Sequence, residues 1–160
     1  MRTFRDGELR FLLPDANWLV QVDDLTSGVP GHLPRVDWAW REPRKYFLCE
    51  LKDPESERAR VHDPRASARM LAELAGPEFP GRLAEKAYYT ITHHVPTQSR
   101  KRRVYIVLAA ISRLNAADMG IAQLLIQNHL KSMGVKLQAI VVNLDAWNLQ
   151  LAPRRVTREP

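Results

Sequence analysis

Residues 35–52, RVDWAWREPRKYFLCELK, form the most informative stretch of this chain. Apolar and aromatic side chains occupy alternate positions over 35–41 and again over 45–52, a pattern typical of β-strands. Residues 42–44 between them, Glu-Pro-Arg, predict a turn, because proline fixes φ and lacks an amide donor. The stretch therefore predicts two antiparallel strands joined as a hairpin.

The turn also predicts which residues of the hairpin oppose each other. A symmetric turn centred between Pro43 and Arg44 places Asp37 opposite Glu50. Opposed residues of an antiparallel pair point to the same side, with Cβ atoms about 4.5–5.5 Å apart. Lys52 is two residues beyond Glu50 and shares that side, because side chains alternate along a strand. One side of the hairpin thus gathers two carboxylates and an ammonium.

The other side of the hairpin is expected to be core. It would carry Val36, Trp38, Trp40, Phe47, Cys49 and Leu51. The charged side would hold Ala39, Tyr46 and Leu48 around the three ionisable groups.

Two opposed carboxylates repel each other unless a proton or a cation lies between them. Their oxygens are hard ligands that suit Mg²⁺ or Mn²⁺. Such a metal lowers the pKa of a bound water and neutralises charge on a phosphate. The Lys52 ammonium is placed to orient the water or to stabilise charge at phosphorus. The group predicts metal-dependent hydrolysis of a phosphodiester, and a cross-strand salt bridge on a solvated face is the plainer alternative.

The same residues resemble the motif of the PD-(D/E)XK nuclease superfamily, which has the restriction-endonuclease-like fold. There an Asp begins one strand of a hairpin and an acid-x-Lys tripeptide lies on the next, as Asp37 and Glu50-Leu51-Lys52 do here. The resemblance implies that Asp37, Glu50 and the Leu51 carbonyl bind Mg²⁺ or Mn²⁺. It implies that Asp37, Glu50 and Lys52 are catalytic, with Lys52 as the catalytic lysine.

The family pattern also points to residues outside the hairpin. It usually includes a further acid from an N-terminal helix, for which Glu8, Asp23 and Asp24 are the candidates here. A helix often borders the active site, and the corresponding segment holds Lys86, Tyr88, Tyr89 and His93. The proline that often precedes the first Asp is displaced, since Pro34 stands three residues before Asp37.

The whole chain predicts an α/β fold with a mixed central β-sheet flanked by helices, similar to restriction endonucleases. Residues 1–150 would form a single nuclease-like domain, and residues 151–160 a loose basic C-terminal tail. The expected strands are 8–13, 18–22, 35–41, 45–52, 104–111 and 135–144, and the expected helices are 55–76, 82–94 and 116–133. For 18–22 a helix is the alternative, because Trp18, Val22 and Leu25 also fit one helical face. A ribonuclease-H-like fold has a similar strand order, but the 104–111 strand lacks the acid that such a site requires.

The charge favours a polyanionic partner. Lys and Arg number 24 against 18 Asp and Glu, a net charge of +6. Nucleic acid, with DNA favoured, is therefore the predicted partner. The basic run Arg100, Lys101, Arg102 and Arg103 is expected to contact phosphates, with an ordinary exposed loop as the alternative.

Other features bear on location and on competing functions. The single cysteine, Cys49, and the absence of a long apolar run predict a cytoplasmic protein that does not enter a membrane. Many nucleases of this fold are dimers, so a homodimer or larger complex is compatible with the resemblance. Two alternatives remain: an inactive nuclease-like subunit that binds nucleic acid or supports assembly, and an accessory interaction protein of a defence or mobile-element system.

Overall fold

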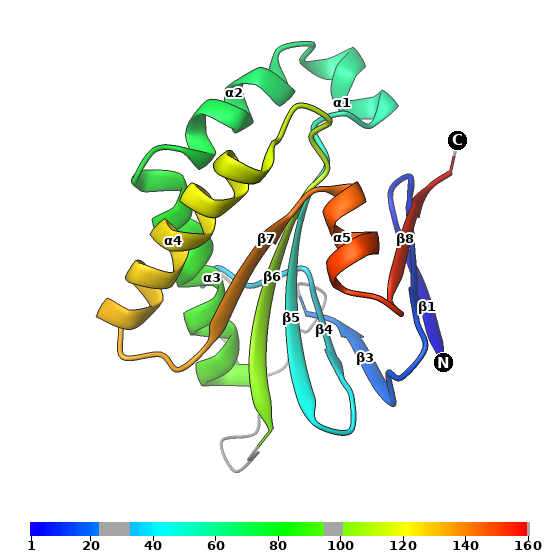
Figure 1. The fold of residues 1–160 in the computed structure, drawn as a ribbon, viewed down its shortest axis with the longest axis vertical. Helices are drawn as coiled ribbons and strands as arrows, with labels where there is room; N and C mark the ends of the chain where they lie inside the picture. Colours follow the sequence, from blue (N-terminus) through cyan, green and yellow to red (C-terminus); the bar gives the residue numbers. More distant parts are fainter. Residues whose placement is uncertain (23–32, 95–100, 160) are drawn as a thin grey trace.

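The computed structural model describes residues 1–22, 33–94 and 101–159, which form two sheets and five helices (Figure 1). The strands are β1 (Arg2–Asp6), β2 (Leu9–Leu13), β3 (Trp18–Gln21), β4 (Trp38–Arg41), β5 (Lys45–Lys52), β6 (Arg102–Ala109), β7 (Gln138–Val142) and β8 (Arg155–Arg158). The helices are α1 (Glu57–His62), α2 (Ala66–Leu74), α3 (Glu78–His94), α4 (Ala116–Ser132) and α5 (Leu144–Gln150).

The central sheet has the strand order β3-β4-β5-β6-β7. The β3–β4 and β4–β5 pairs are antiparallel, whereas the β5–β6 and β6–β7 pairs are parallel. This mixed sheet confirms the predicted α/β class. A second sheet, β1-β2-β8, is antiparallel throughout.

The β4–β5 hairpin has the predicted register. Trp38 pairs with Cys49 and Trp40 with Phe47, as a turn centred between Pro43 and Arg44 requires. Strand β5 spans the predicted residues, but β4 begins only at Trp38.

Helices cover one face of the central sheet, and the small sheet with α5 covers the other (Figure 1). Leu48 of β5 packs with α2, α3 and α4, whereas Phe47 and Cys49 pack with the small sheet and α5. The face expected to carry the charged groups is therefore buried rather than solvated. Val36 was predicted on the Trp38 side but packs on the helix side, because it precedes β4 and its backbone N–H donates to Thr90 of α3 at 3.0 Å.

Two local predictions were wrong, and one strand was missed. The helix expected over 55–76 divides into α1 and α2, because Pro64 interrupts the helical hydrogen bonds. The segment expected as a loose tail forms β8, which pairs with β2 and buries Val156. Strand β1 was not predicted; it joins β2 through a turn in which Gly7 has φ 57°.

The outer edge of β7 is covered by two glutamines of α4. Gln127 accepts a hydrogen bond from Ala139 N–H and donates one to the Leu137 carbonyl, both at 2.9 Å. Gln123 accepts from Val141 N–H at 3.2 Å. Residues four apart share one side of a helix, so the two side chains follow the strand edge together. They satisfy backbone groups that an edge strand otherwise leaves unpaired.

In the part of the chain that the structure describes, no helix is both long and apolar enough to cross a membrane.

Phe11 tests whether the small sheet is integral to the fold. Its side chain is 0% exposed and stacks on Phe4, with ring centroids 4.3 Å apart. Phe11→Ala should lower the free energy of unfolding by about 3–5 kcal/mol, measured by urea denaturation. Leu149→Ala is the control, because Leu149 is 81% exposed and should change stability by less than about 0.5 kcal/mol. Equal effects of the two substitutions would contradict the packing described here.

Candidate active site

Glu50 lies near the carboxyl end of β5, the middle strand of the central sheet. Its side chain points toward the helices, because it alternates with Cys49 and Leu51, which pack on the other face. Glu50 is 0% exposed. A fully buried carboxylate requires compensating charge or hydrogen bonds.

Two lysines supply that charge. The Nζ atoms of Lys52 and Lys86 each lie 2.6 Å from Oε1 of Glu50. Lys52 follows on the same strand, whereas Lys86 reaches across from α3. Both lysine side chains are about a quarter exposed, 24% for Lys52 and 27% for Lys86. The buried carboxylate therefore meets the surface through two ammonium groups.

The second carboxylate oxygen of Glu50, Oε2, is buried and has no hydrogen-bond partner among the described residues. A buried acceptor left unpaired costs roughly 1–3 kcal/mol. Such atoms are uncommon in folded proteins, and catalysis or ion binding is a frequent reason for them.

Asp37 joins this group from the segment that leads into β4. Its Oδ2 accepts a hydrogen bond from the Leu51 N–H at 2.6 Å, between Glu50 and Lys52 in the chain. Burial and then the negative charge of Glu50 raise the pKa of Asp37 to about 7, although the Leu51 N–H, Lys86 and Lys52 act to lower it. We call Asp37, Glu50, Lys52 and Lys86 the acid–lysine cluster.

Neighbouring groups hold α3 and the Asp37 segment against the sheet. Tyr105 of β6 is buried and donates its hydroxyl proton to the Leu83 carbonyl of α3 at 2.9 Å. Burial, with the charges of Glu50 and Asp37, raises the pKa of the Tyr105 hydroxyl well above its usual value. The Asp37 carbonyl accepts from Val22 N–H at 2.8 Å, which joins the segment to the end of β3.

The three residues predicted from the hairpin therefore lie together, and the structure adds Lys86. Lys86 was one of four candidates on its helix, but the sequence offered no reason to prefer it. Glu50 does form an ion pair with Lys52, but the pair lies within one strand and on a buried face, unlike the cross-strand salt bridge on a solvated face that was the alternative reading.

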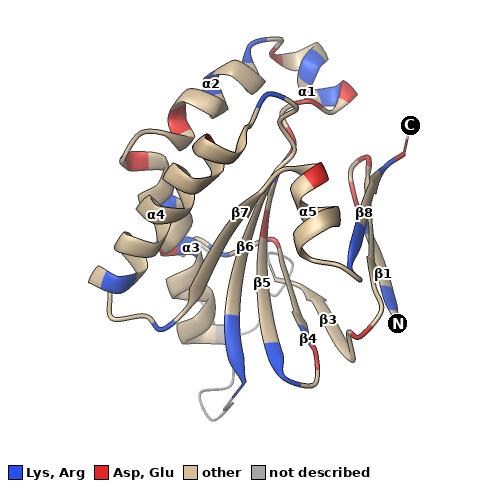
Figure 2. Ribbon diagram, viewed as in Figure 1, with Lys and Arg blue, Asp and Glu red and all other residues tan. Residues whose placement is uncertain are grey.

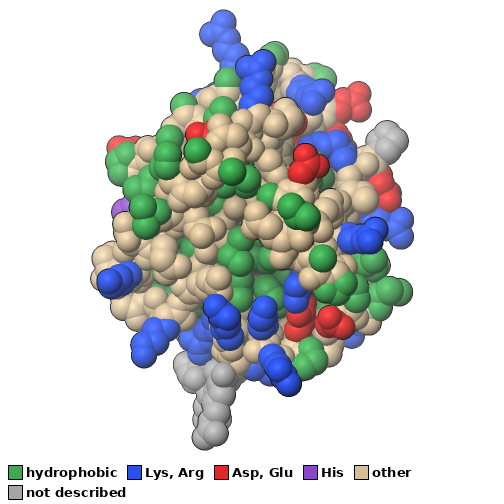
Figure 3. All heavy atoms as spheres, viewed as in Figure 1, with side chains coloured by type: hydrophobic (Ala, Val, Ile, Leu, Met, Phe, Trp, Pro, Cys, Tyr) green, Lys and Arg blue, Asp and Glu red, His purple; other side chains and the backbone are tan. Residues whose placement is uncertain are grey.

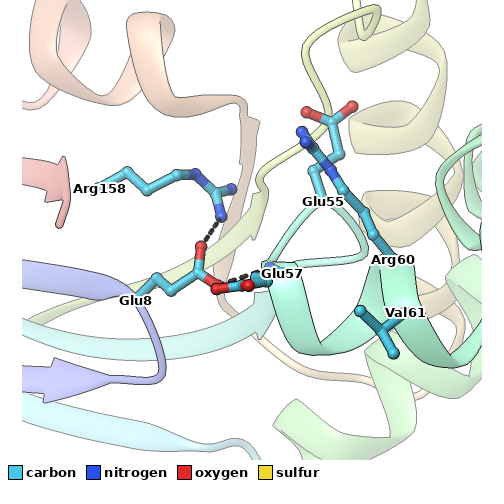
Figure 4. A pocket seen from close by; sticks show the side chains of 6 residues that line it. All are labelled: Glu8, Glu55, Glu57, Arg60, Val61 and Arg158. Atoms are coloured by element: carbon cyan, nitrogen blue, oxygen red, sulfur yellow. Dashed lines mark hydrogen bonds and ion pairs between the residues drawn. The ribbon is translucent and has the colours of Figure 1, made fainter. Parts of the chain in front are cut away.

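Glu8 lies apart from this cluster. It occupies a pocket between the β1–β2 turn and α1, where it accepts from Glu57 N–H at 2.6 Å and pairs with Arg158 at 2.9 Å (Figure 4). These two hydrogen bonds lower the pKa of Glu8. Arg158 also binds Asp53 through both terminal nitrogens, at 2.6 and 3.0 Å. Glu8 thus serves to join the two chain ends to α1. The other two candidates for a further acid, Asp23 and Asp24, lie outside the described residues.

The donor set fits a hard divalent cation in part. Within the described residues, no group of three His, Cys, Asp or Glu side chains could hold a metal ion. Two carboxylates remain, and the two lysines engage only Oε1 of Glu50. Oε2 of Glu50 and the Asp37 carboxylate are the side-chain oxygens left for Mg²⁺ or Mn²⁺. The Leu51 carbonyl lies beside Asp37, because the N–H and C=O of a strand residue point to the same side.

The predicted phosphate-contacting run lies elsewhere. Arg100 is outside the described residues, Lys101 precedes β6, and Arg102 and Arg103 begin that strand rather than forming a loop. Arg102 aligns with Lys45 in the parallel β5–β6 ladder, five residues before Glu50. At about 3.3 Å per residue, roughly 16 Å separates it from Glu50 along the strands.

Comparison of the chain with protein-family models, curated proteins and solved structures gave no match.

The raised pKa of Asp37 predicts a stability that depends on pH. Its ordinary pKa of 3.8 rises to about 7 on folding, so the folded state holds the proton more tightly and loses stability as the pH rises between these values. Asp37→Asn removes the charge and keeps an acceptor for the Leu51 N–H. The free energy of unfolding of the variant should exceed that of the wild type by roughly 1–3 kcal/mol at about pH 8 and equal it at about pH 4.

Urea denaturation in EDTA at both pH values makes this measurement. A variant less stable than the wild type at the higher pH would show that the Asp37 carboxylate is not penalised by burial.

Proposed function

We propose that this protein is a metal-dependent nuclease of the PD-(D/E)XK type that hydrolyses phosphodiester bonds, with DNA as the favoured substrate. The observation that carries the proposal is the buried Glu50 carboxylate, which has two ammonium groups on one oxygen and, among the described residues, no hydrogen-bond partner on the other. Asp37, with its raised pKa, lies beside it.

Each residue of the acid–lysine cluster has a role in this chemistry. Asp37 and Glu50 would hold Mg²⁺ or Mn²⁺, with the Leu51 carbonyl as a further ligand. The metal, when bound, supplies an activated water and neutralises phosphate charge. Lys52 and Lys86 fix the orientation of Glu50 through Oε1 and present positive charge toward a phosphate. Lys52 would orient the attacking water or stabilise the charge that develops at phosphorus.

A purely structural role explains this cluster poorly. Hydrophobic residues of similar volume often replace a buried ion pair without loss of stability. Leu48, Tyr105 and Ala87 already pack on this face of the sheet, so an apolar residue at position 50 would extend the core. The raised pKa of Asp37 and the unpaired oxygen of Glu50 both cost stability, and costs of this kind are typical of functional sites.

One observation favours the inactive alternative. When all four groups of the acid–lysine cluster are ionised, two negative and two positive charges cancel, so the cluster can be neutral without a metal. On that reading the protein binds nucleic acid through its basic surface and does not cleave it.

Cleavage assays separate the two readings. The wild type should cut plasmid, single-stranded DNA or RNA in Mg²⁺ or Mn²⁺ but not in EDTA. Glu50→Gln and Lys52→Ala should each slow cleavage by about 100-fold or more, because the first weakens metal binding and the second removes positive charge near the reacting phosphate. Glu85→Gln is the matched control, since Glu85 is an exposed neighbour of Lys86, and it should leave the rate unchanged.

Circular dichroism and thermal melting would confirm that each variant is folded. Cleavage that persists in both site variants would remove the acid–lysine cluster from the reaction. A wild type that binds but never cuts would establish the inactive reading.

A further inference from the structure

A basic groove lies at the end of the central sheet where β6 and β7 begin. It has a volume of about 640 Å³ and is lined by Lys101, Arg102, Arg103, Gln127, Lys131, Val135, Lys136, Leu137 and Gln138. Five of these nine residues are cationic and none is acidic. Figure 2 shows basic residues at this end of β5, β6 and α4, and Figure 3 shows Lys and Arg side chains gathered along the corresponding edge of the surface.

The cations of the groove come from separate parts of the chain. Arg102 and Arg103 begin β6, Lys131 is in the last turn of α4, and Lys136 lies in the connection to β7. The helix dipole accounts for a lysine at the end of α4, but it does not account for the other three. Bringing like charges together is unfavourable unless an anion lies among them.

Within the described part of the chain, these four cations also have no ion-pair partner that explains their position. No described carboxylate forms an ion pair with Arg102, Arg103, Lys131 or Lys136. Elsewhere Arg154 is paired with the buried Glu42. The fifth cation of the groove, Lys101, donates to the Glu42 carbonyl at 2.8 Å.

The neutral part of the groove is fixed in place. Both ends of the Gln127 amide are used on the edge of β7, so this side chain offers little to a ligand. Arg102, Lys131 and Lys136 are exposed, and their charged groups face solvent. Guanidinium and ammonium groups of this kind suit phosphate oxygens, which carry no base sequence information.

We propose that this basic groove holds the phosphate backbone of a nucleic-acid strand while the acid–lysine cluster acts on another part of the same strand. This inference rests on the proposed function. Arg103 aligns with Tyr46, and both lie on the helix side of the sheet, as Glu50 does. Tyr46 is four residues before Glu50, about 13 Å along the strand. In duplex DNA that offset corresponds to about four base-pair steps of 3.4 Å, so substrates must extend at least that far from the bond cleaved.

Salt-dependent binding tests the groove without cleavage. Labelled single-stranded and duplex DNA of one sequence would be titrated in EDTA at several salt concentrations. Lys131→Ala with Lys136→Ala should weaken binding and reduce the slope of log K against log salt by nearly 2 for duplex, because each lost phosphate contact contributes about 0.9. Arg2→Ala with Arg58→Ala is the charge-matched control on β1 and α1, and it should leave the slope unchanged.

The outcomes separate this inference from the nuclease proposal. Glu50→Gln should slow cleavage by about 100-fold or more and keep the wild-type slope. If the lysine pair loses binding but no variant or wild type cleaves, the groove stands and the nuclease proposal fails. Equal slopes for the lysine-pair and arginine-pair variants would show only a general effect of charge and would overturn the proposed role of the groove. The absence of binding to either DNA at low salt would overturn it as well.

Discussion

The contact between the Glu50 carboxylate and the Lys86 ammonium joins the central sheet to the helical layer at a buried point. Two neighbouring hydrogen bonds act between the same layers, from Tyr105 to the Leu83 carbonyl and from Val36 N–H to Thr90. Helix α3 is thus tied to the segment before β4, to β5 and to β6. Because hydrogen bonds and ion pairs are directional, these contacts specify the position of α3 more narrowly than apolar packing alone.

The same contact shapes the electrostatics of the site. Burial strengthens both the attraction between Glu50 and its lysines and the repulsion between Glu50 and Asp37. The lysines act on one oxygen, so the repulsion is only partly relieved, and burial together with this repulsion raises the pKa of Asp37 to about 7. Such a site lowers the stability of the fold, because its carboxylates are buried close together. In return it creates an electric field of the kind that acts on a cation or a phosphate.

The sequence was most informative where local rules determine the structure. Pro43 marked the turn, the turn set the register, and the alternation of side chains put Glu50 and Lys52 on one side, so three members of the site were accessible from a short stretch. Lys86 was not singled out, because its contact depends on how α3 packs across the sheet. Strands β1 and β8 were missed for a similar reason: β8 carries a single buried apolar residue, Val156, and is defined by pairing with β2 at the other end of the chain. Val36 was assigned to the wrong face because the predicted strand began three residues before β4 does.

The two glutamines along β7 limit how copies of this protein can associate. A strand edge with free amide and carbonyl groups invites another strand to extend the sheet, in a partner or in an aggregate. Gln123 and Gln127 occupy those groups at Leu137, Ala139 and Val141, so a continuous sheet across β7 could form only if α4 first moved away. Two copies could therefore associate at this edge only through side-chain contacts. During folding, β7 becomes protected against pairing with a strand of another chain as soon as α4 packs against it.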